Sequence, residues 1–184
     1  PILGSLDIFG RYDMTATMKV PLALNTGLSW YALPELELAA DFRYWFYQVY
    51  EKQEIFHGID FEVMGEPAVP NPLVTPRNYE GSWQVSVGAM WRPFDMPLDF
   101  MTGWSYDHSP CPKETKNLDS PSVDLTGFSL GARYILNDMW RLSATYYRYW
   151  YLRNETTNSI LDPPQNAQFW GTVDTFSLQM EVVM

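Results

Sequence analysis

Few residues of this chain have the type and spacing that catalysis or metal binding requires. The two histidines, His57 and His108, lie in or beside segments that are expected to be loops, with no nucleophile placed next to them. The acidic residues nearest to a metal-binding pattern lack the central glycine of a calcium-binding loop. They are Asp60, Glu62 and Glu66. The sequence therefore predicts no enzyme activity, no metal site and no cofactor.

The bulk composition allows one domain and argues against nucleic-acid binding. The chain has 184 residues, 46% of them apolar, which is enough for one domain with a core. No stretch approaches the ~20 consecutive apolar residues of a membrane helix, whereas eight Trp and twelve Tyr suit a membrane interface. The net charge of −10 is opposite to what a phosphate-binding surface needs. Cys111 is the single cysteine, so no disulfide framework is expected.

Between residues 81 and 153 the chain repeats one unit: two alternating runs joined by a tiny turn and followed by a polar loop. In each run the apolar residues occupy every second position, which is the period of a β-strand. One face of each strand is apolar and aromatic, and the other is small or polar. The positions on the apolar face are Trp83, Val85, Val87, Ala89 and Trp91, then Leu98, Phe100, Thr102, Trp104 and Tyr106, then Phe128, Leu130, Ala132 and Tyr134.

Seven strands can be traced, joined alternately by short turns and long loops. The first strand contains Pro21, and because proline cannot donate to a ladder we expect a bulge or kink there. The strands are expected at residues 12–32, 36–52, 81–93, 98–107, 124–136, 139–153 and 172–184. The long outer loops are expected at about 53–79, 108–123 and 154–171, and the first of them is too rich in proline for regular structure.

The separation of short from long connections favours a transmembrane, antiparallel, all-β barrel of the bacterial outer membrane, with short periplasmic turns and long external loops. The other interpretation is a soluble β-sandwich whose core is the apolar face. Seven strands do not close a single-chain bacterial barrel, which normally has an even number, and open edges do not survive in lipid. We therefore expect residues 1–184 to be the C-terminal part of one larger barrel domain, completed by an N-terminal half or by a partner chain.

Two sequence elements are more specific than strand alternation. Residues 83–91 read W-x-V-x-V-G-x-x-W, and residues 103–112 read G-W-x-Y-D-x-S-P-x-P. Weaker elements of the same kind lie at 19–21, 27–30 and 129–134. From about residue 12 to residue 184 the chain resembles the long-chain fatty acid transporter family of outer-membrane proteins (FadL/TodX type). The resemblance implies a fourteen-stranded barrel with an N-terminal hatch, of which this chain matches the last seven strands.

A carrier of hydrophobic acids, as the resemblance implies, needs a cation for the carboxylate, because an unpaired charge inside a protein is costly. Arg43 faces the barrel interior by parity. Lys52 and Arg77 flank the outer loop, near where the family places a basic residue that meets the ligand head group. Trp45 and Tyr47 are expected near the external mouth. We predict these five residues as ligand-binding.

Other interpretations of the same residue types stay open. Arg43, Arg133 and Arg141 can instead be struts that pair with acidic residues across the lumen. The segment 146–151 can form an outer aromatic belt, with Arg148 on the lipid-facing side above the hydrocarbon edge.

The resemblance implies a channel for passive uptake of hydrophobic small molecules, such as long-chain fatty acids or aromatic hydrocarbons. The expected partners are membrane lipid and lipopolysaccharide outside the barrel, a hydrophobic small molecule inside it, and the missing barrel half. No nucleic acid is expected as a partner. The alternative function is a barrel scaffold subunit of an outer-membrane assembly without transport activity.

Overall fold

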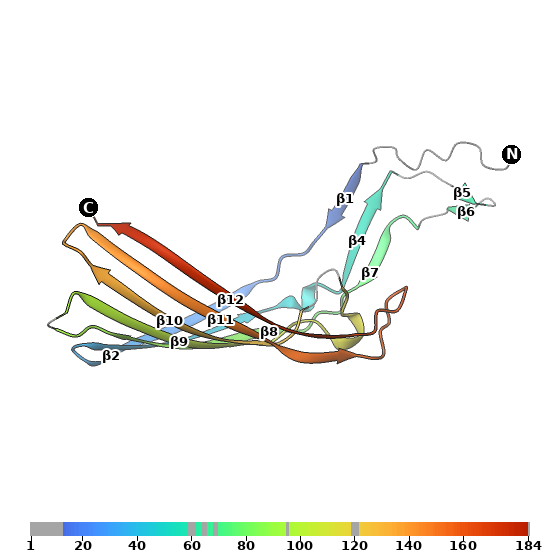
Figure 1. Ribbon diagram of the computed structural model, residues 1–184. Helices are drawn as coiled ribbons and strands as arrows, with labels where there is room; N and C mark the ends of the chain where they lie inside the picture. Colours follow the sequence, from blue (N-terminus) through green and yellow to red (C-terminus); the bar gives the residue numbers. More distant parts are fainter. Residues whose placement is uncertain are drawn as a thin grey trace.

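A computed structural model of the chain describes residues 13–58, 62–63, 66–67, 70–94, 96–118 and 122–183. Most of these residues form one curved, open, antiparallel sheet of seven strands, and a smaller sheet of three strands projects from one end of it (Figure 1). The C-terminus lies at the opposite end, together with the short turns (Figure 1). The seven-stranded sheet confirms the predicted strand number and the all-β class.

The large sheet is a meander: each of its strands pairs with the strand of the same sheet that comes next along the chain. The order across the sheet is β12-β11-β10-β9-β8-β3-β2. Its strands are β2 (Ala23–Leu33), β3 (Leu36–Trp45), β8 (Ser82–Trp91), β9 (Leu98–Asp107), β10 (Leu125–Ile135), β11 (Trp140–Thr156) and β12 (Ala167–Val182). Strands β2 and β12 are the two outermost strands, so the sheet is an open wall and not a closed barrel.

The first predicted strand, 12–32, is wrong as a single strand. The structure has β1 (Met14–Thr17) and β2, separated by the segment that contains Pro21. Instead of continuing β2, β1 pairs with β4 (Lys52–His57), which in turn pairs with β7 (Leu73–Pro76). Proline has no amide hydrogen to continue the ladder, so the chain leaves the large sheet there. Tyr12 lies outside the described residues.

The first long loop is more regular than predicted. Besides β4 and β7 it contains β5 (Glu62–Val63) and β6 (Glu66–Pro67), which pair with each other. Proline is tolerated because it occupies strand ends, as Pro76 does in β7. The predicted strand 36–52 is correspondingly too long, because β3 ends at Trp45 and a short 3₁₀ helix, η1 (Tyr47–Val49), follows it.

The last outer loop is shorter than predicted. Strand β11 continues to Thr156 and β12 begins at Ala167, so the connection spans residues 157–166 and not 154–171. The pairing register shifts between Tyr151 and Asn154. A bulge of this kind lets the pairing of two strands continue past an irregular point. Alternation in the sequence does not reveal such a bulge, so the predicted strand ends too early.

The apolar face of the large sheet has no second layer over it among the described residues. Leu28 and Leu178 are each 73% exposed, and Trp170 is equally open. The buried hydrophobic residues of the described chain all lie in the outer loops and not against this face; they are Tyr50, Cys111, Val123 and Leu161. A β-sandwich would bury the apolar face in a dry core, so the arrangement is that of a membrane-facing wall.

Among the described residues no helix is both long and apolar enough to cross a membrane.

Candidate functional site

The face opposite the apolar one is lined by glycine and serine in the middle of the sheet. Gly88 lies opposite Gly103, and Ser105 lies opposite Gly127. A Cβ added to Gly127 would meet the Tyr147 hydroxyl at 2.6 Å, because the tyrosine ring crosses this glycine. The Tyr147 hydroxyl is 2.8 Å from Ser105 Oγ and shares a hydrogen bond with it. Side chains therefore project little from the inner wall at this point, because the Tyr147 ring lies across Gly127 and is hydrogen-bonded to Ser105.

Ion pairs join neighbouring strands on the inner face of the sheet, near the end with the short turns. Arg133 Nη2 lies 2.5 Å from Asp99 Oδ2, and the Asp99 residue is only 4% exposed. Arg141 Nη1 lies 3.8 Å from Glu181 Oε1, a looser and more exposed pair. Arg133 and Arg141 thus pair with acidic residues as the strut interpretation expected, but each partner lies directly opposite on the neighbouring strand and not across the lumen.

Arg43 has a different environment from these struts. Its guanidinium lies over the Trp45 ring, 5.4 Å from the ring centre, and no ion pair to Arg43 is present among the described residues. The side chain borders a polar recess of about 330 Å³ on the inner wall. The other polar residues around this recess are Asn25, Thr26, Asp41, Gln84 and Ser86. Arg43 and Trp45 are thus brought together, and the recess beside Arg43 contains amides, hydroxyls and the Asp41 carboxylate.

The other three predicted ligand residues do not converge on one point. Lys52 Nζ forms an ion pair of 2.7 Å with Glu54 on the same face of β4, and it is exposed. Arg77 is 9% exposed and donates a hydrogen bond to Gln53, whose side chain leaves β4 on the other face. Tyr47 packs edge-on against Tyr79, with the ring centres 6.0 Å apart. The roles of Lys52, Arg77 and Tyr47 in ligand binding stay predictions.

The outer loops form a packed cap, which the sequence did not reveal. The Thr115 hydroxyl donates to the Arg77 carbonyl at 2.6 Å, joining the second long loop to the first. The Thr156 hydroxyl donates to the Lys113 carbonyl at 2.9 Å, joining the second loop to β11. The backbone amide of Ile160 donates to the Glu114 carbonyl at 3.0 Å and so adds the third loop. These bonds connect segments far apart in the chain, so no local pattern marks them.

Burial changes the acid–base behaviour of the cap. It raises the pKa of the Cys111 thiol, with Lys116 acting in the opposite direction. It likewise raises the pKa of the Tyr79 hydroxyl. For the Lys116 ammonium, burial lowers the pKa. In each case removal from water penalises the charged form.

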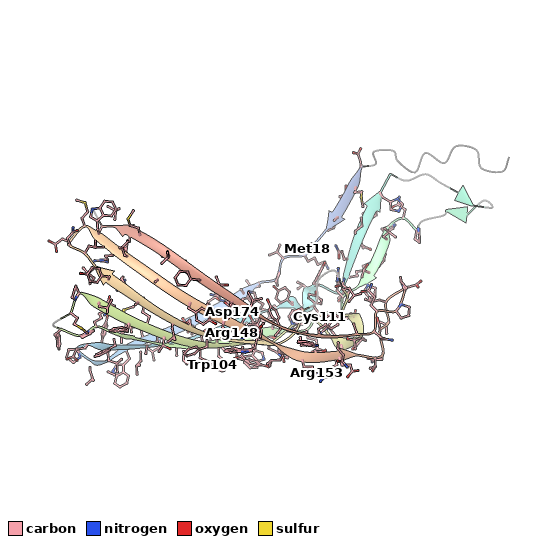
Figure 2. All side chains as sticks on the ribbon, viewed as in Figure 1. Met18, Trp104, Cys111, Arg148, Arg153 and Asp174 are labelled. Atoms are coloured by element: carbon pink, nitrogen blue, oxygen red, sulfur yellow. The ribbon has the colours of Figure 1, made fainter. Side chains whose placement is uncertain are left out.

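The outward face carries a polar cluster at the outer part of β11 and β12, where Figure 2 shows Arg148 beside Asp174. Arg148 Nε lies 3.6 Å from Asp174 Oδ1, the Tyr146 hydroxyl donates to the same oxygen, and the Arg148 guanidinium lies over the Trp150 ring. Eight residues of tilted strand separate Arg148 from Trp140 at the start of β11, which corresponds to about 21 Å in a band of about 25 Å. Arg148 is thus placed near the outer edge of the band, just inside the position above the edge that the aromatic-belt interpretation expected.

Residues 127–131 read Gly-Phe-Ser-Leu-Gly, which has the Gly-x-Ser-x-Gly spacing of a nucleophile elbow. An elbow of this type sits at a sharp turn from a strand to a helix. Here the five residues lie within β10, and Ser129 Oγ is 3.5 Å from the Gly103 carbonyl oxygen. His108 is paired with Asp124 at 3.1 Å, beyond the outer end of β9. The motif therefore lacks the geometry of a catalytic serine.

No group of three or more metal-binding side chains is found within the part of the chain that the structure describes. Asp60 lies outside that part, and the side chains of Glu62 and Glu66 are not described.

An open antiparallel meander with an uncovered apolar face, a small and polar opposite face, and connections sorted by length to the two ends is the wall of an outer-membrane β-barrel. The chain belongs to the outer membrane protein transport protein family (OMPP1/FadL/TodX), whose family model matches residues 3–182. It is therefore a protein of the bacterial outer membrane.

A solved structure supports the fold. The chain is similar to the crystal structure of a Pseudomonas aeruginosa FadL homologue, with a TM-score of 0.68 and 18% sequence identity. The match covers 92% of this chain and 37% of that chain, so the present sequence spans well under half of the solved protein. No curated protein matches the chain in sequence.

Proposed function

We propose that this chain forms the C-terminal half of the wall of an outer-membrane channel that passively takes up hydrophobic small molecules, such as long-chain fatty acids or aromatic hydrocarbons. The observation that carries the proposal is the contrast between the two faces of the large sheet. The outward face exposes large apolar side chains such as Leu28 and Leu178, and the inward face is built from glycine, serine and paired charges. Family membership supports transport as the activity.

The ligand is proposed to pass along the inner wall, with Arg43 meeting an acidic head group. Arg43 forms no ion pair among the described residues, although Asp41 borders the same recess and the Arg43 charge reaches Asp107 from a distance. The guanidinium can therefore still pair with the carboxylate of a ligand. Asn25 and Gln84 border the same recess and can donate further hydrogen bonds. A neutral hydrocarbon would gain nothing from this cation.

The test is uptake of labelled oleate and of labelled toluene by cells carrying the full gene. Arg43→Ala is expected to lower oleate uptake about tenfold, the effect of losing one charged hydrogen bond, and to leave toluene uptake unchanged. Arg153→Ala is the matched control, since Arg153 is exposed at the outer end of β11 and bonds to Gln168 (Figure 2). Barrel folding is checked for every variant by heat-modifiable migration.

A double variant, Lys52→Ala with Arg77→Ala, tests the two predicted cations of the outer loop. Unchanged oleate uptake by this variant would remove them from the ligand site. If the parent protein takes up neither compound, the channel function is refuted and the scaffold alternative is favoured.

A further inference from the structure

The packed cap contains a buried lysine that forms no ion pair with any residue that the structure describes. Lys116 is 1% exposed, and its ammonium lies 5.7 Å from the centre of the Phe169 ring. Among the described residues no carboxylate is within ion-pair distance of it, and no hydrogen bond from Nζ is present. A buried ammonium is costly unless it is paired, and a ring face compensates only part of that cost. The lowered pKa of Lys116 has the same physical origin.

The lysine borders a cavity of about 350 Å³ at the outer end of the sheet. Asn154 of β11 lines the same cavity, and its side-chain Oδ1 is buried without a hydrogen-bond partner. Rotation of that amide by half a turn presents its NH₂ group instead, because the two ends of an amide have nearly the same shape. A buried lysine without an ion pair among the described residues and a buried amide oxygen without a hydrogen-bond partner thus border one cavity, whereas buried polar atoms are normally satisfied.

The acidic residues around the cavity are Glu80, Glu114 and Asp124, and none of them forms an ion pair with Lys116, although the Asp124 charge acts on it from a distance. Glu114 is half-exposed. Asp124 already accepts hydrogen bonds from the Tyr106 hydroxyl at 2.9 Å and from the Ser109 amide at 2.8 Å, and it pairs with His108. Glu80 also borders the cavity but is exposed, so water screens its charge. Inside the cavity the lower dielectric strengthens the field of the buried ammonium.

We propose that this cavity is a binding site for a small oxyanion of the carboxylate or phosphate type, with Lys116 as the pairing cation and the Asn154 amide beside it. An oxyanion supplies the charge that Lys116 lacks and the hydrogen-bond partner that Asn154 lacks. The site is distinct from the Arg43 recess on the inner wall, and it does not depend on the proposed transport activity.

The test is calorimetric titration of the purified full gene product in a non-ionic detergent with sodium butyrate and, separately, with sodium phosphate. Ionic strength is held constant with chloride. If only butyrate binds saturably, the site is specific for carboxylates, and if only phosphate binds, it is specific for phosphates. If both bind, the site accepts oxyanions in general. Each of these outcomes supports the proposal. If neither anion binds to the parent protein, the proposal is overturned.

Lys116→Met keeps the length of the side chain and removes the charge. We expect this variant to weaken anion binding at least about tenfold, the loss of one charged hydrogen bond. Lys19→Met is the matched control and is expected to bind like the parent, since Lys19 is exposed between β1 and β2. Equal anion affinity of Lys116→Met and the parent would overturn the proposal.

A purely structural role for Lys116 predicts a different result. If the ammonium only held the cap together, Lys116→Met would lower the midpoint of thermal unfolding in the absence of anion. Our proposal predicts no decrease, because the variant removes an unpaired buried charge. Asn154→Asp is the second variant, to be used also if Lys116→Met does not fold. It places a carboxylate in the cavity and is expected to abolish anion binding while raising the unfolding midpoint.

Discussion

The orientation of the large sheet can be tested at two adjacent residues of β12. Leu178 is 73% exposed on the apolar face, and Ser177 is exposed on the opposite face. Leu178 precedes the end of β12 at Val182 by four residues. At about 3.4 Å per residue and a tilt of about 40°, it lies about 10 Å from the inner end of the strand. That depth is close to the middle of an apolar band about 25 Å thick.

Leu178→Lys would therefore place an ammonium near the centre of the bilayer. The expected loss in the free energy of unfolding is about 2–4 kcal/mol. Ser177→Lys, one residue away, would place the same ammonium in the watery lumen and should change the free energy by less than about 0.5 kcal/mol. The two variants introduce the same residue in the same strand at nearly the same depth, and they differ in the face and in the residue replaced.

The measurement is urea unfolding of the full gene product in phospholipid vesicles, followed by tryptophan fluorescence. The two values should differ by at least about 2 kcal/mol, with Leu178→Lys the less stable. Equal destabilisation by the two substitutions, or a larger loss for Ser177→Lys, would refute the assignment of the faces.

Two further predictions concern the inner wall and the cap. Asp99→Asn should lower the free energy of unfolding by about 1–3 kcal/mol, because it leaves the Arg133 charge of a buried pair without its partner. Arg141→Met should cost less than about 1 kcal/mol, since its pair with Glu181 is long and half-exposed; equal losses in urea unfolding would contradict the strut assignment. Cys111 should react with iodoacetamide at pH 7.5 at least about tenfold more slowly than a free thiol, because burial raises its pKa and leaves less thiolate. Its alkylation rate should still be rising with pH above 9, and a rate that levels off near neutral pH would show a lowered pKa.

The sequence was most informative where the pattern is local. Alternation at residues such as Val87 and Gly88 fixes which side chains share a face, because the period of a strand is two. The lengths of the connections then separate the two ends of the sheet. Together these features predicted the meander, its seven strands and the outward position of the apolar face, all of which the structure has.

Prediction from the sequence failed where a segment pairs with another segment that is far away along the chain. The exit of the chain at Pro21 follows from proline chemistry, but nothing near Pro21 names β4 as the partner of β1. The opposite directions of the Lys52 and Arg77 side chains likewise depend on where β4 and the cap place them. The residue types at these positions are known from the sequence, but the neighbours of each side chain cannot be predicted from it.

Short-range order along the chain was enough to predict the seven strands of the large sheet, their two faces and the family resemblance. The burial of Lys116 beside Phe169 and the cavity that it shares with Asn154 became visible only in the folded chain. The physical reason is that burial and charge pairing depend on contacts between loops that are remote in sequence, and a lysine in a polar loop is ordinarily solvated.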